Sequence, residues 1–240
     1  MKSYYYDLHL HSCLSPCADD DMTPANLAGM LKLANIELAA LTDHNTTKNC
    51  PAFFKACESY GIIPIAGMEL TTAEEIHLLC LFPTLSLASN FENEISNRRM
   101  KVLNRPDLFG NQLILNENDE IIGSEEFLLS VATNISLEEA VVLVSKNNGV
   151  CYPAHVDRES GGIIAILGVI PDTPNFSCVE FRDPSNISEY KYKYQLPHII
   201  ISSSDAHFLT GIPDASARIA LEGVSNDEIR THLINLLSGK

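Results

Sequence analysis

The chain has 240 residues and a formal net charge of −15, with 45% hydrophobic and 20% charged residues. This length and composition predict one globular domain with a substantial core. The excess of acidic residues argues against a broad basic surface, so we do not expect long nucleic acid or an anionic membrane as a partner. The charge does not exclude a small nucleotide as a ligand, because a bound metal cluster can supply local positive charge.

The seven cysteines are scattered singly, and no C-x-x-C pair is present. This spacing argues against a zinc ribbon or a redox-active dithiol and favours reduced, buried thiols. No apolar run reaches the roughly 18 residues that span a bilayer, and the N-terminus lacks a signal-peptide core. We therefore expect a soluble, cytoplasmic protein.

The first expected strand, residues 4–11, contains the run Asp7-Leu8-His9-Leu10-His11. Successive side chains of a strand point to opposite faces, so His9 and His11 should point one way and Leu8 and Leu10 the other. Two imidazoles on one face form half of a site for a divalent metal. Asp7 shares their face and is a candidate for orienting an imidazole.

The next segments alternate between strands and helices. Residues 12–21 break regular structure, and Thr23-Pro24 predicts the start of a helix that continues to residue 35. Apolar strands are expected at 36–42, 62–66 and 76–82, with a helix at 47–60. Apolar strands joined by helices predict a parallel α/β architecture.

The second half of the chain is expected to continue the same domain. Residues 84–103 look helical and 104–134 are rich in Asn, Gly and acids, so we expect a small insertion or cap at about 84–134 within a single domain, 1–240. The remaining expected elements are helices at 136–148, 163–169 and 227–237 and strands at 150–154, 178–181 and 198–203.

Histidines and acids gather at the ends of these strands. Those at or just after C-terminal strand ends are His11, Asp43, His44, Glu69, His155, Asp205 and His207. His77 is the exception, because it lies near the start of its strand. Barrel and open α/β folds build their sites at the C-terminal strand ends, so one shared site explains the whole set. His, Asp and Glu without Cys suit Zn, Mn or Fe.

The ordered motifs resemble those of the PHP (polymerase and histidinol phosphatase) family of metal-dependent phosphoesterases. The motifs that carry the resemblance are Asp7-Leu8-His9-Leu10-His11-Ser12, Leu41-Thr42-Asp43-His44-Asn45, Gly67-Met68-Glu69-Leu70, His155 and Ser204-Asp205-Ala206-His207. They extend from residue 5 to about residue 212. The resemblance implies an α/β fold, a distorted barrel of about seven βα units, with up to three divalent metals at its C-terminal face.

The resemblance also implies which residues hold each metal. His9 and His11 would hold the first metal with Glu69 and Asp205, Glu69 would bridge to a second metal completed by His77 and His155, and His44 and His207 would hold a third. The third metal's remaining ligand comes from the loop after the first strand, where this chain has Pro16 and Cys17 at the family's positions. Counting back from Thr23-Pro24 favours Asp19, with Asp20 and Cys17 as alternatives.

The metals predict the reaction. Neighbouring metals stabilise the attacking and leaving oxygens of an in-line displacement, so we expect a metal-activated water to hydrolyse a phosphomonoester or diester of a small metabolite or nucleotide. Asp43 is expected to orient an imidazole, and Arg158 to contact the substrate phosphate. Weaker candidates for phosphate contacts are Lys48, Arg98, Arg99 and Arg218.

Two other classes of function stay open at this point. One is a metal-binding regulatory module without turnover. The other is an amidohydrolase-like enzyme that cleaves C–N bonds, a class that commonly uses a carboxylated lysine. No lysine lies at a strand end here, and the D-x-H pattern suits a phosphoesterase better.

Overall fold

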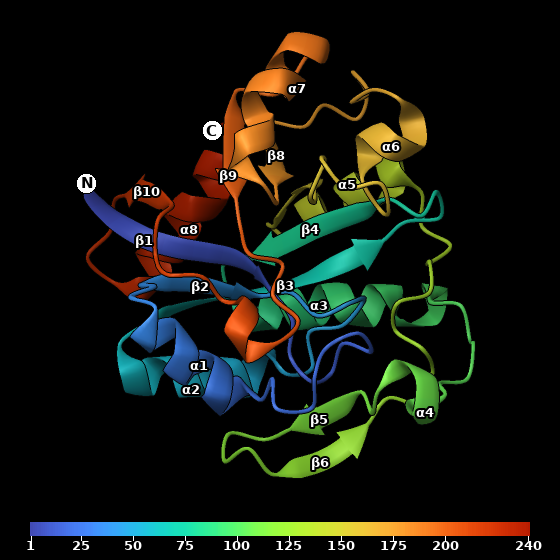
Figure 1. Ribbon diagram of the computed structural model, residues 1–240, viewed down its shortest axis with the longest axis vertical. Helices are drawn as coiled ribbons and strands as arrows, with labels where there is room; N and C mark the ends of the chain where they lie inside the picture. The colour runs from blue at the N-terminus through green and yellow to red at the C-terminus, as the bar shows by residue number, and fades with distance from the viewer.

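A curled sheet with helices on its outer face forms the body of the protein (Figure 1), and the computed structural model describes all 240 residues. The strands are β1 (Lys2–Leu10), β2 (Leu38–Leu41), β3 (Ile63–Thr71), β4 (His77–Phe82), β5 (Leu113–Leu115), β6 (Ile121–Ser124), β7 (Val150–Pro153), β8 (Cys178–Phe181), β9 (Ile199–Ser202) and β10 (Arg218–Leu221). The helices are α1 (Pro24–Leu33), α2 (Cys50–Tyr60), α3 (Leu85–Ile95), α4 (Pro106–Phe109), α5 (Leu137–Lys146), α6 (Ile163–Leu167), α7 (Ile187–Lys193) and α8 (Asn226–Leu237). None of these helices is long and apolar enough to cross a membrane.

The strands are arranged as a distorted barrel, which confirms the expected fold class. Six strands pair in the order β10-β1-β2-β3-β4-β7, while β8 and β9 form a separate parallel pair. The expectation of a wholly parallel sheet is wrong, because β3 with β4, β4 with β7 and β10 with β1 are antiparallel. Only residues 72–76 join β3 to β4, and a parallel crossover needs a longer connection.

The reversed direction of β4 explains the position of His77. His77 begins β4 and pairs with Thr71, the last residue of β3. Since β4 runs antiparallel to β3, its first residue lies at the edge where the parallel strands end. The residue that broke the sequence pattern therefore lies at the same end of the barrel as the others.

A register irregularity in β1 changes which way its leucines face. The pairing of β1 with β2 shifts between Asp7 and Leu10. Leu8 consequently packs in the barrel interior with Leu38 and Ile65, whereas Leu10 packs among residues that contact the outer helices. The expectation that Leu8 and Leu10 share one face is thus wrong, although His9 and His11 still lie together.

The core consists of two apolar clusters on the two faces of the sheet. The larger contains residues of α1, α2, α3 and α5 packed on the outside, such as Leu31, Phe53 and Phe91. The smaller fills the barrel interior and is closed by Leu233 and Leu237 of α8. Neither apolar cluster includes the polar side chains that gather at the C-terminal strand ends.

The segment after α3 leaves the sheet. Ala88, Phe91 and Ile95 of α3 pack in the core. The helix expected over 84–103 ends at Ile95, and a short 3-10 turn, Ser96–Arg98, follows it. The hairpin β5-β6 then packs on the loop after β1: the Leu113 N–H donates to the Cys13 carbonyl at 2.9 Å. The sequence analysis did not predict α4, β5, β6, α7 or the edge strand β10.

We predict that Leu8→Ala lowers the free energy of unfolding by about 2–5 kcal/mol, because it leaves a cavity in the fully buried barrel interior. Leu33→Ala is the matched control, since Leu33 is 75% exposed and its loss should change stability by less than about 0.5 kcal/mol. Urea titration of both variants measures the difference, and equal stabilities would contradict the packing described.

Candidate metal centre

His9 and His11 aim the same ring atom at one point in the barrel. Their Nε2 atoms lie 3.1 Å apart, and both residues are fully buried. Nitrogens this close share a proton or a cation, because two lone pairs repel each other. The β1 strand therefore presents two imidazole nitrogens at one point, an arrangement typical of a metal site.

The other ring nitrogen of each histidine is held by a partner that fixes its proton. Nδ1 of His9 lies 2.8 Å from Oε1 of Glu180, and Nδ1 of His11 lies 2.9 Å from the Ser15 hydroxyl. A carboxylate only accepts, and the Ser15 hydroxyl already donates to Asp43 at 2.7 Å, so both Nδ1 atoms are donors. When a metal is bound, Nε2 of each ring would therefore be the ligand atom.

Glu69 and Asp205 supply the carboxylates around this pair. The Nε2 atom of His11 lies 3.3 Å from Oε2 of Glu69 and 3.4 Å from Oδ1 of Asp205. The second oxygen of Glu69 contacts Nδ1 of His77 at 2.7 Å and Nε2 of His155 at 2.9 Å. Glu69 thus touches two groups of histidines, one with each oxygen.

The imidazoles control the charge of these buried carboxylates. Burial would raise the pKa of Glu69, but the imidazoles of His77, His9 and His44 outweigh it and hold that pKa well below its usual range. Burial likewise opposes the charged form of His9, yet Glu180, Asp205 and Glu69 raise its pKa well above the usual value. The site therefore keeps its carboxylates anionic next to positive charge, and a divalent cation would supply that charge in place of the imidazole protons.

His44 and His207 form the third part of the cluster with His11. The three rings offer ligand atoms within 4.8 Å of one another. Burial, followed by the charge of the neighbouring His11, lowers the pKa of His207 to about 4. Its Nδ1 donates to the Asp205 carbonyl at 2.8 Å, which leaves Nε2 unprotonated for a metal.

Two residues of the cluster have strained backbone. His155 has φ 27° and Asp205 has φ 51°, both in the left-handed region that non-glycine residues rarely occupy. Such conformations cost about 1–3 kcal/mol each and persist where the surroundings enforce them, commonly at functional sites. Here each one turns a chain that is leaving a strand so that its side chain faces the cluster.

The cluster contains buried polar atoms that have no hydrogen-bond partner and could instead bind a divalent metal. Buried side-chain atoms without a hydrogen-bond partner include His44 Nδ1, His155 Nδ1 and Asp205 Oδ1. His44 Nδ1 lies only 3.1 Å from Glu69 Oε2 without bonding to it. Buried polar atoms almost always have partners, so this concentration of free lone pairs matches a set of metal ligands.

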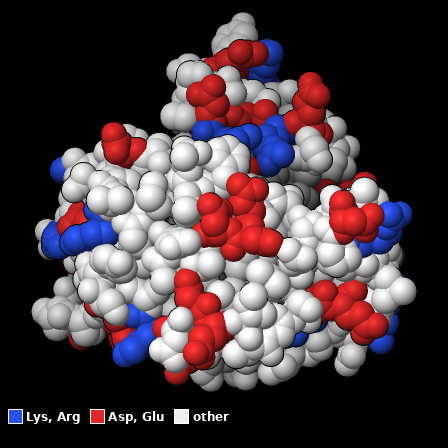
Figure 2. All heavy atoms as spheres, turned by 60° about the horizontal axis from the view of Figure 1, so that its bottom comes forward, with Lys and Arg blue, Asp and Glu red and all other residues white.

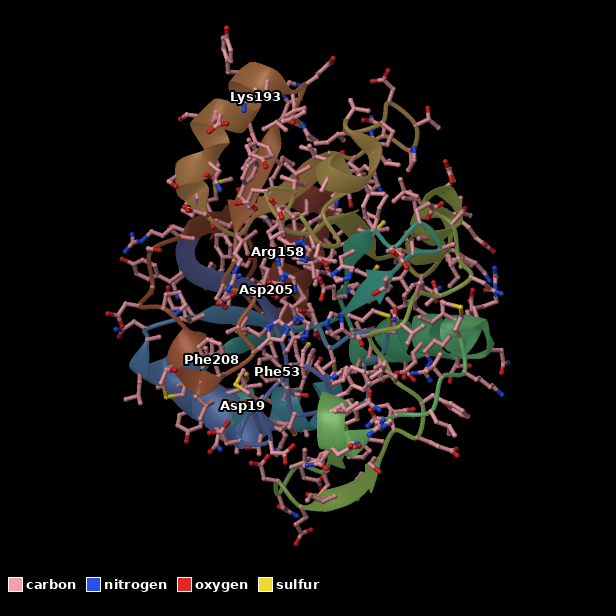
Figure 3. The ribbon with its side chains drawn as sticks, turned by 45° about the vertical axis from the view of Figure 1, so that its right-hand side comes forward. Asp19, Phe53, Arg158, Lys193, Asp205 and Phe208 are labelled. Atoms are coloured by element: carbon pink, nitrogen blue, oxygen red, sulfur yellow. The ribbon has the colours of Figure 1, made fainter.

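The loop after β1 does not bring its predicted ligand into this cluster. The metal-type groups are His9-His11-Asp205, His11-His44-His207 and His44-Glu69-His77, and none includes Asp19, Asp20 or Cys17. Asp19 is exposed and is held near His207 by its backbone N–H, while Figure 3 shows it apart from Arg158 and Asp205. Asp20 accepts a hydrogen bond from Asn111 at 2.5 Å. The loop ligand of the third metal stays a prediction.

Asp43 acts on the cluster through serines. Its carboxylate accepts from the Ser12 hydroxyl at 2.6 Å and from the Ser15 hydroxyl at 2.7 Å, and Ser15 in turn holds His11. Asp43 thus contacts the His11 imidazole only through the Ser15 hydroxyl.

Arg158 lies against the cluster, beside Asp205 in Figure 3, with its Nη1 2.5 Å from Oδ2 of Asp205. Its side chain is 37% exposed, so a substrate can reach it. The weaker candidates are engaged elsewhere: Arg98 binds Glu139, Lys48 pairs with Glu125 and Arg218 covers the Tyr5 ring. Arg99 donates only weakly, to the Asn45 carbonyl at 3.4 Å.

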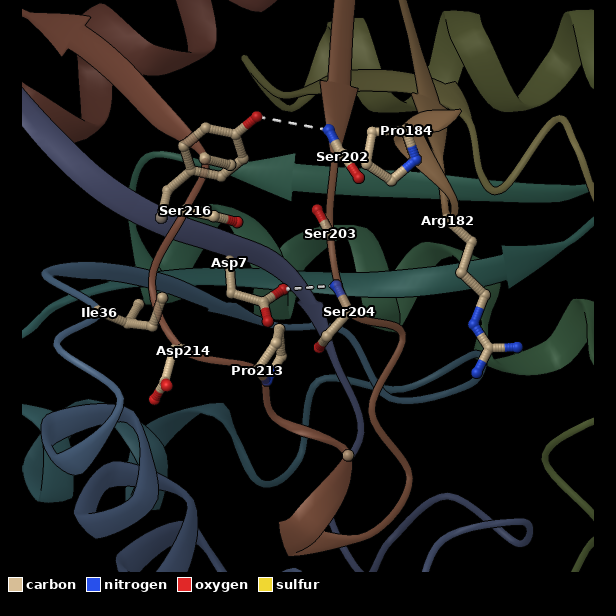
Figure 4. Close-up of a pocket in the computed structure, with 13 residues that line it drawn as sticks. Asp7, Ile36, Arg182, Pro184, Ser202, Ser203, Ser204, Pro213, Asp214 and Ser216 are labelled. Carbon is tan, nitrogen blue, oxygen red and sulfur yellow. Dashed lines mark hydrogen bonds between the residues drawn. The ribbon is translucent and has the colours of Figure 1, made fainter. Parts of the chain in front are cut away.

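Asp7 faces away from the cluster. Its Oδ1 accepts from the backbone N–H groups of Ser204 and His9, and its carboxylate lines a cavity of about 540 Å³ beside β1 and β9 (Figure 4). No histidine lines this cavity. The expectation that Asp7 orients an imidazole is therefore wrong, and the register irregularity of β1 is the reason.

Glu180, Ser15 and Gly161 contribute to the site without having been predicted from sequence. Gly161 has φ +72°, and a Cβ added there would lie 2.8 Å from the His77 ring. Its carbonyl also accepts from the His77 N–H at 2.9 Å. The pair Gly161-Gly162 in a region without a strand was a sequence signal for a close backbone approach.

Comparisons with known proteins identify a domain family and similar folds. The model of the PHP domain matches residues 7–167, whereas a search among curated proteins found no match. The lesion-specific endonuclease Q of Pyrococcus furiosus has a similar structure, with a TM-score of 0.64 and 20% identity over 99% of this chain. A candidate metal-dependent phosphoesterase of Bifidobacterium adolescentis has a TM-score of 0.57 and 15% identity, covering 97% of this chain and 96% of its own.

The fold and the His/Glu/Asp cluster define an α/β protein of the distorted-barrel class with a candidate site for divalent metals. The chain belongs to the PHP domain family. It spans 56% of the length of the endonuclease Q chain.

The expectation that the acidic net charge rules out long nucleic acid as a partner is wrong. A second endonuclease Q structure, with a TM-score of 0.60, 19% identity and coverage of 95% of this chain and 56% of its own, holds a 27-mer duplex with an abasic lesion at its active site. Net charge is a poor guide because contacts with phosphates are local. Figure 2 shows Lys and Arg gathered at the base of a projecting lobe, while the acidic residues form separate patches elsewhere on this face.

We predict that Gly161→Ala weakens zinc binding by about tenfold or more, because the added methyl displaces the His77 ring. Gly168→Ala is the matched control: Gly168 has φ +77° and nothing within 4 Å of an added Cβ. Both variants should lose similar stability, about 1–2 kcal/mol, from the left-handed backbone. Calorimetric zinc titration separates them, and equal zinc affinities would contradict the contact with His77.

Proposed function

We propose that this protein is a metal-dependent phosphoesterase that hydrolyses a phosphodiester or phosphomonoester in a nucleotide or nucleic acid. The proposal rests on the convergence of the His9 and His11 Nε2 atoms with the carboxylates of Glu69 and Asp205. One ligand atom each from His9, His11 and Asp205 lie within 4.8 Å of one another, and Glu69 Oε2 lies 3.3 Å from His11 Nε2. Bound divalent cations would polarise the phosphoryl group and make a water molecule nucleophilic near neutral pH.

The chain's own residues would hold the metals and orient the substrate. His9, His11, Glu69 and Asp205 supply ligands for one metal, and Glu69 with His77 and His155 supplies them for a second. His44 and His207 complete a third site with a further donor, for which Asp19 is our first choice. Zn, Mn and Fe all suit such imidazole and carboxylate ligands.

Arg158 would bind a non-bridging oxygen of the substrate phosphate. It is the one cationic side chain in direct contact with the cluster, and its guanidinium has room to turn from Asp205 toward a ligand because it is partly exposed. A planar guanidinium binds phosphate with two parallel hydrogen bonds, which orients the ester for in-line attack.

The proposed substrate class is based on the structural similarity to endonuclease Q and on the ester chemistry that a metal centre of this kind can perform. Endonuclease Q acts on DNA lesions, so we take DNA with an abasic site as the first substrate to assay, with nucleotide monoesters and small phosphorylated metabolites as further arms. The module without turnover and the C–N hydrolase are the rival functions. The module would bind metal and release nothing, and the C–N hydrolase would cleave amides rather than esters.

We predict that metal-loaded protein cleaves at least one of these phosphoesters, that chelation abolishes cleavage, and that His9→Ala removes both cleavage and most bound metal. Product release and metal analysis of the same samples are the measurements. Bound metal without cleavage of any ester in the panel would contradict the proposal.

A separate prediction concerns Arg158. Arg158→Gln should lower kcat/KM by about 10–100-fold, the range expected for losing a hydrogen bond to a charged group, and should leave the metal content unchanged. Arg98→Gln is the control, since Arg98 pairs with Glu139 away from the cluster. Unchanged kcat/KM in Arg158→Gln would remove this residue from the site.

A further inference from the structure

Glu180 is a fully buried carboxylate that belongs to none of the sequence motifs. It lies in the middle of β8, in the apolar run Cys178-Val179-Glu180-Phe181, and has no exposed surface. No lysine or arginine forms an ion pair with it; its partner is His9. A buried carboxylate without a cationic partner is costly, so its presence among apolar neighbours calls for a specific contact that stabilises it.

Two donors converge on one oxygen of Glu180. Oε1 lies 2.8 Å from Nδ1 of His9 and 3.2 Å from the backbone nitrogen of His155. The backbone carbonyl of Glu180 also accepts from the Val156 N–H at 2.9 Å. Because β8 forms no ladder with β7 or β1, these contacts fix this part of the barrel wall against the metal-facing strands.

The contact with His9 has a direct consequence for the opposite ring nitrogen. With the proton held on Nδ1, the His9 Nε2 lone pair points at His11 Nε2 at 3.1 Å and Asp205 Oδ1 at 3.4 Å. The alternative tautomer would put a proton on Nε2 and block metal binding there. Glu180 itself is not in any of the groups of metal-type ligands.

We propose that Glu180 is a positioning residue of the metal centre, whose Oε1 fixes the tautomer and ring orientation of His9 and links them to the backbone of His155. This inference rests on the proposed function only in taking His9 as a metal ligand. It predicts that an acceptor oxygen at this position matters more than the negative charge.

Two substitutions separate orientation from charge. Glu180→Gln keeps a carbonyl oxygen where His9 Nδ1–H and His155 N–H both donate, whereas Glu180→Met has similar length and no acceptor. Tyr152→Phe is the control for a change in the same buried region, because the Tyr152 hydroxyl has no hydrogen-bond partner. Circular dichroism checks that each variant folds.

The test uses Zn²⁺ as the probe, with calorimetric affinity and histidine ¹⁵N NMR as readouts. In zinc-loaded wild-type protein we expect His9, assigned by its absence in His9→Ala, to carry its proton on Nδ1 and zinc on Nε2. Glu180→Met should bind zinc about 10–100-fold more weakly, and Glu180→Gln and Tyr152→Phe less than about tenfold more weakly.

Three results would overturn the inference: a wild-type His9 protonated on Nε2, a folded Glu180→Met with wild-type zinc affinity, or a Glu180→Gln that loses as much affinity as Glu180→Met. If Glu180→Met does not fold, the wild-type tautomer and the Glu180→Gln affinity decide. Zinc bound with the expected tautomer but no ester cleavage would remove the proposed function alone. Cleavage that persists with unchanged zinc affinity in Glu180→Met would remove this inference alone.

Discussion

The structure depends on one buried carboxylate surrounded by imidazoles. Glu69 is 1% exposed and lies within 3.5 Å of five histidine rings, those of His9, His11, His44, His77 and His155. A carboxylate in such a place is stable only with positive charge beside it, supplied by imidazolium protons or by metal ions. Metal binding must therefore displace protons from these rings, which couples the affinity for metal to pH.

The irregular features of the barrel bring the side chains of this cluster together. Four strands that come early in the chain and three segments that come late deliver side chains to one edge. Reversal of β4 brings His77 to the edge, and the irregularity in β1 turns Leu8 inward while His9 and His11 stay together. Strained backbone at His155 and Asp205 completes the convergence, which is the usual sign of a geometry maintained for chemistry rather than stability.

Sequence patterns predicted the parts of the site that recur at short spacing. The H-x-H pair, the D-H pair and the D-x-H pair each place ligands by strand period or strand end, so they were visible without a structure. Glu180 could not be predicted in this way, because a single acid in a four-residue apolar strand forms no sequence pattern. Its role depends on the contact with His9, which is 171 residues away in the sequence. The antiparallel β4 could have been inferred from the short link at 72–76. In contrast, the packing of residues 104–134 on the loop after β1 depends on long-range polar contacts such as the Leu113 N–H with the Cys13 carbonyl.

We infer that the buried histidine–carboxylate cluster, with at most one ligand from the loop after β1, holds the divalent metals. Anomalous diffraction from crystals grown with Mn²⁺ or Zn²⁺ tests this inference most directly. We expect strong peaks between His9, His11 and Asp205 and beside Glu69 and His77. Peaks confined to exposed acids such as Asp19–Asp21, with none inside the barrel, would contradict it.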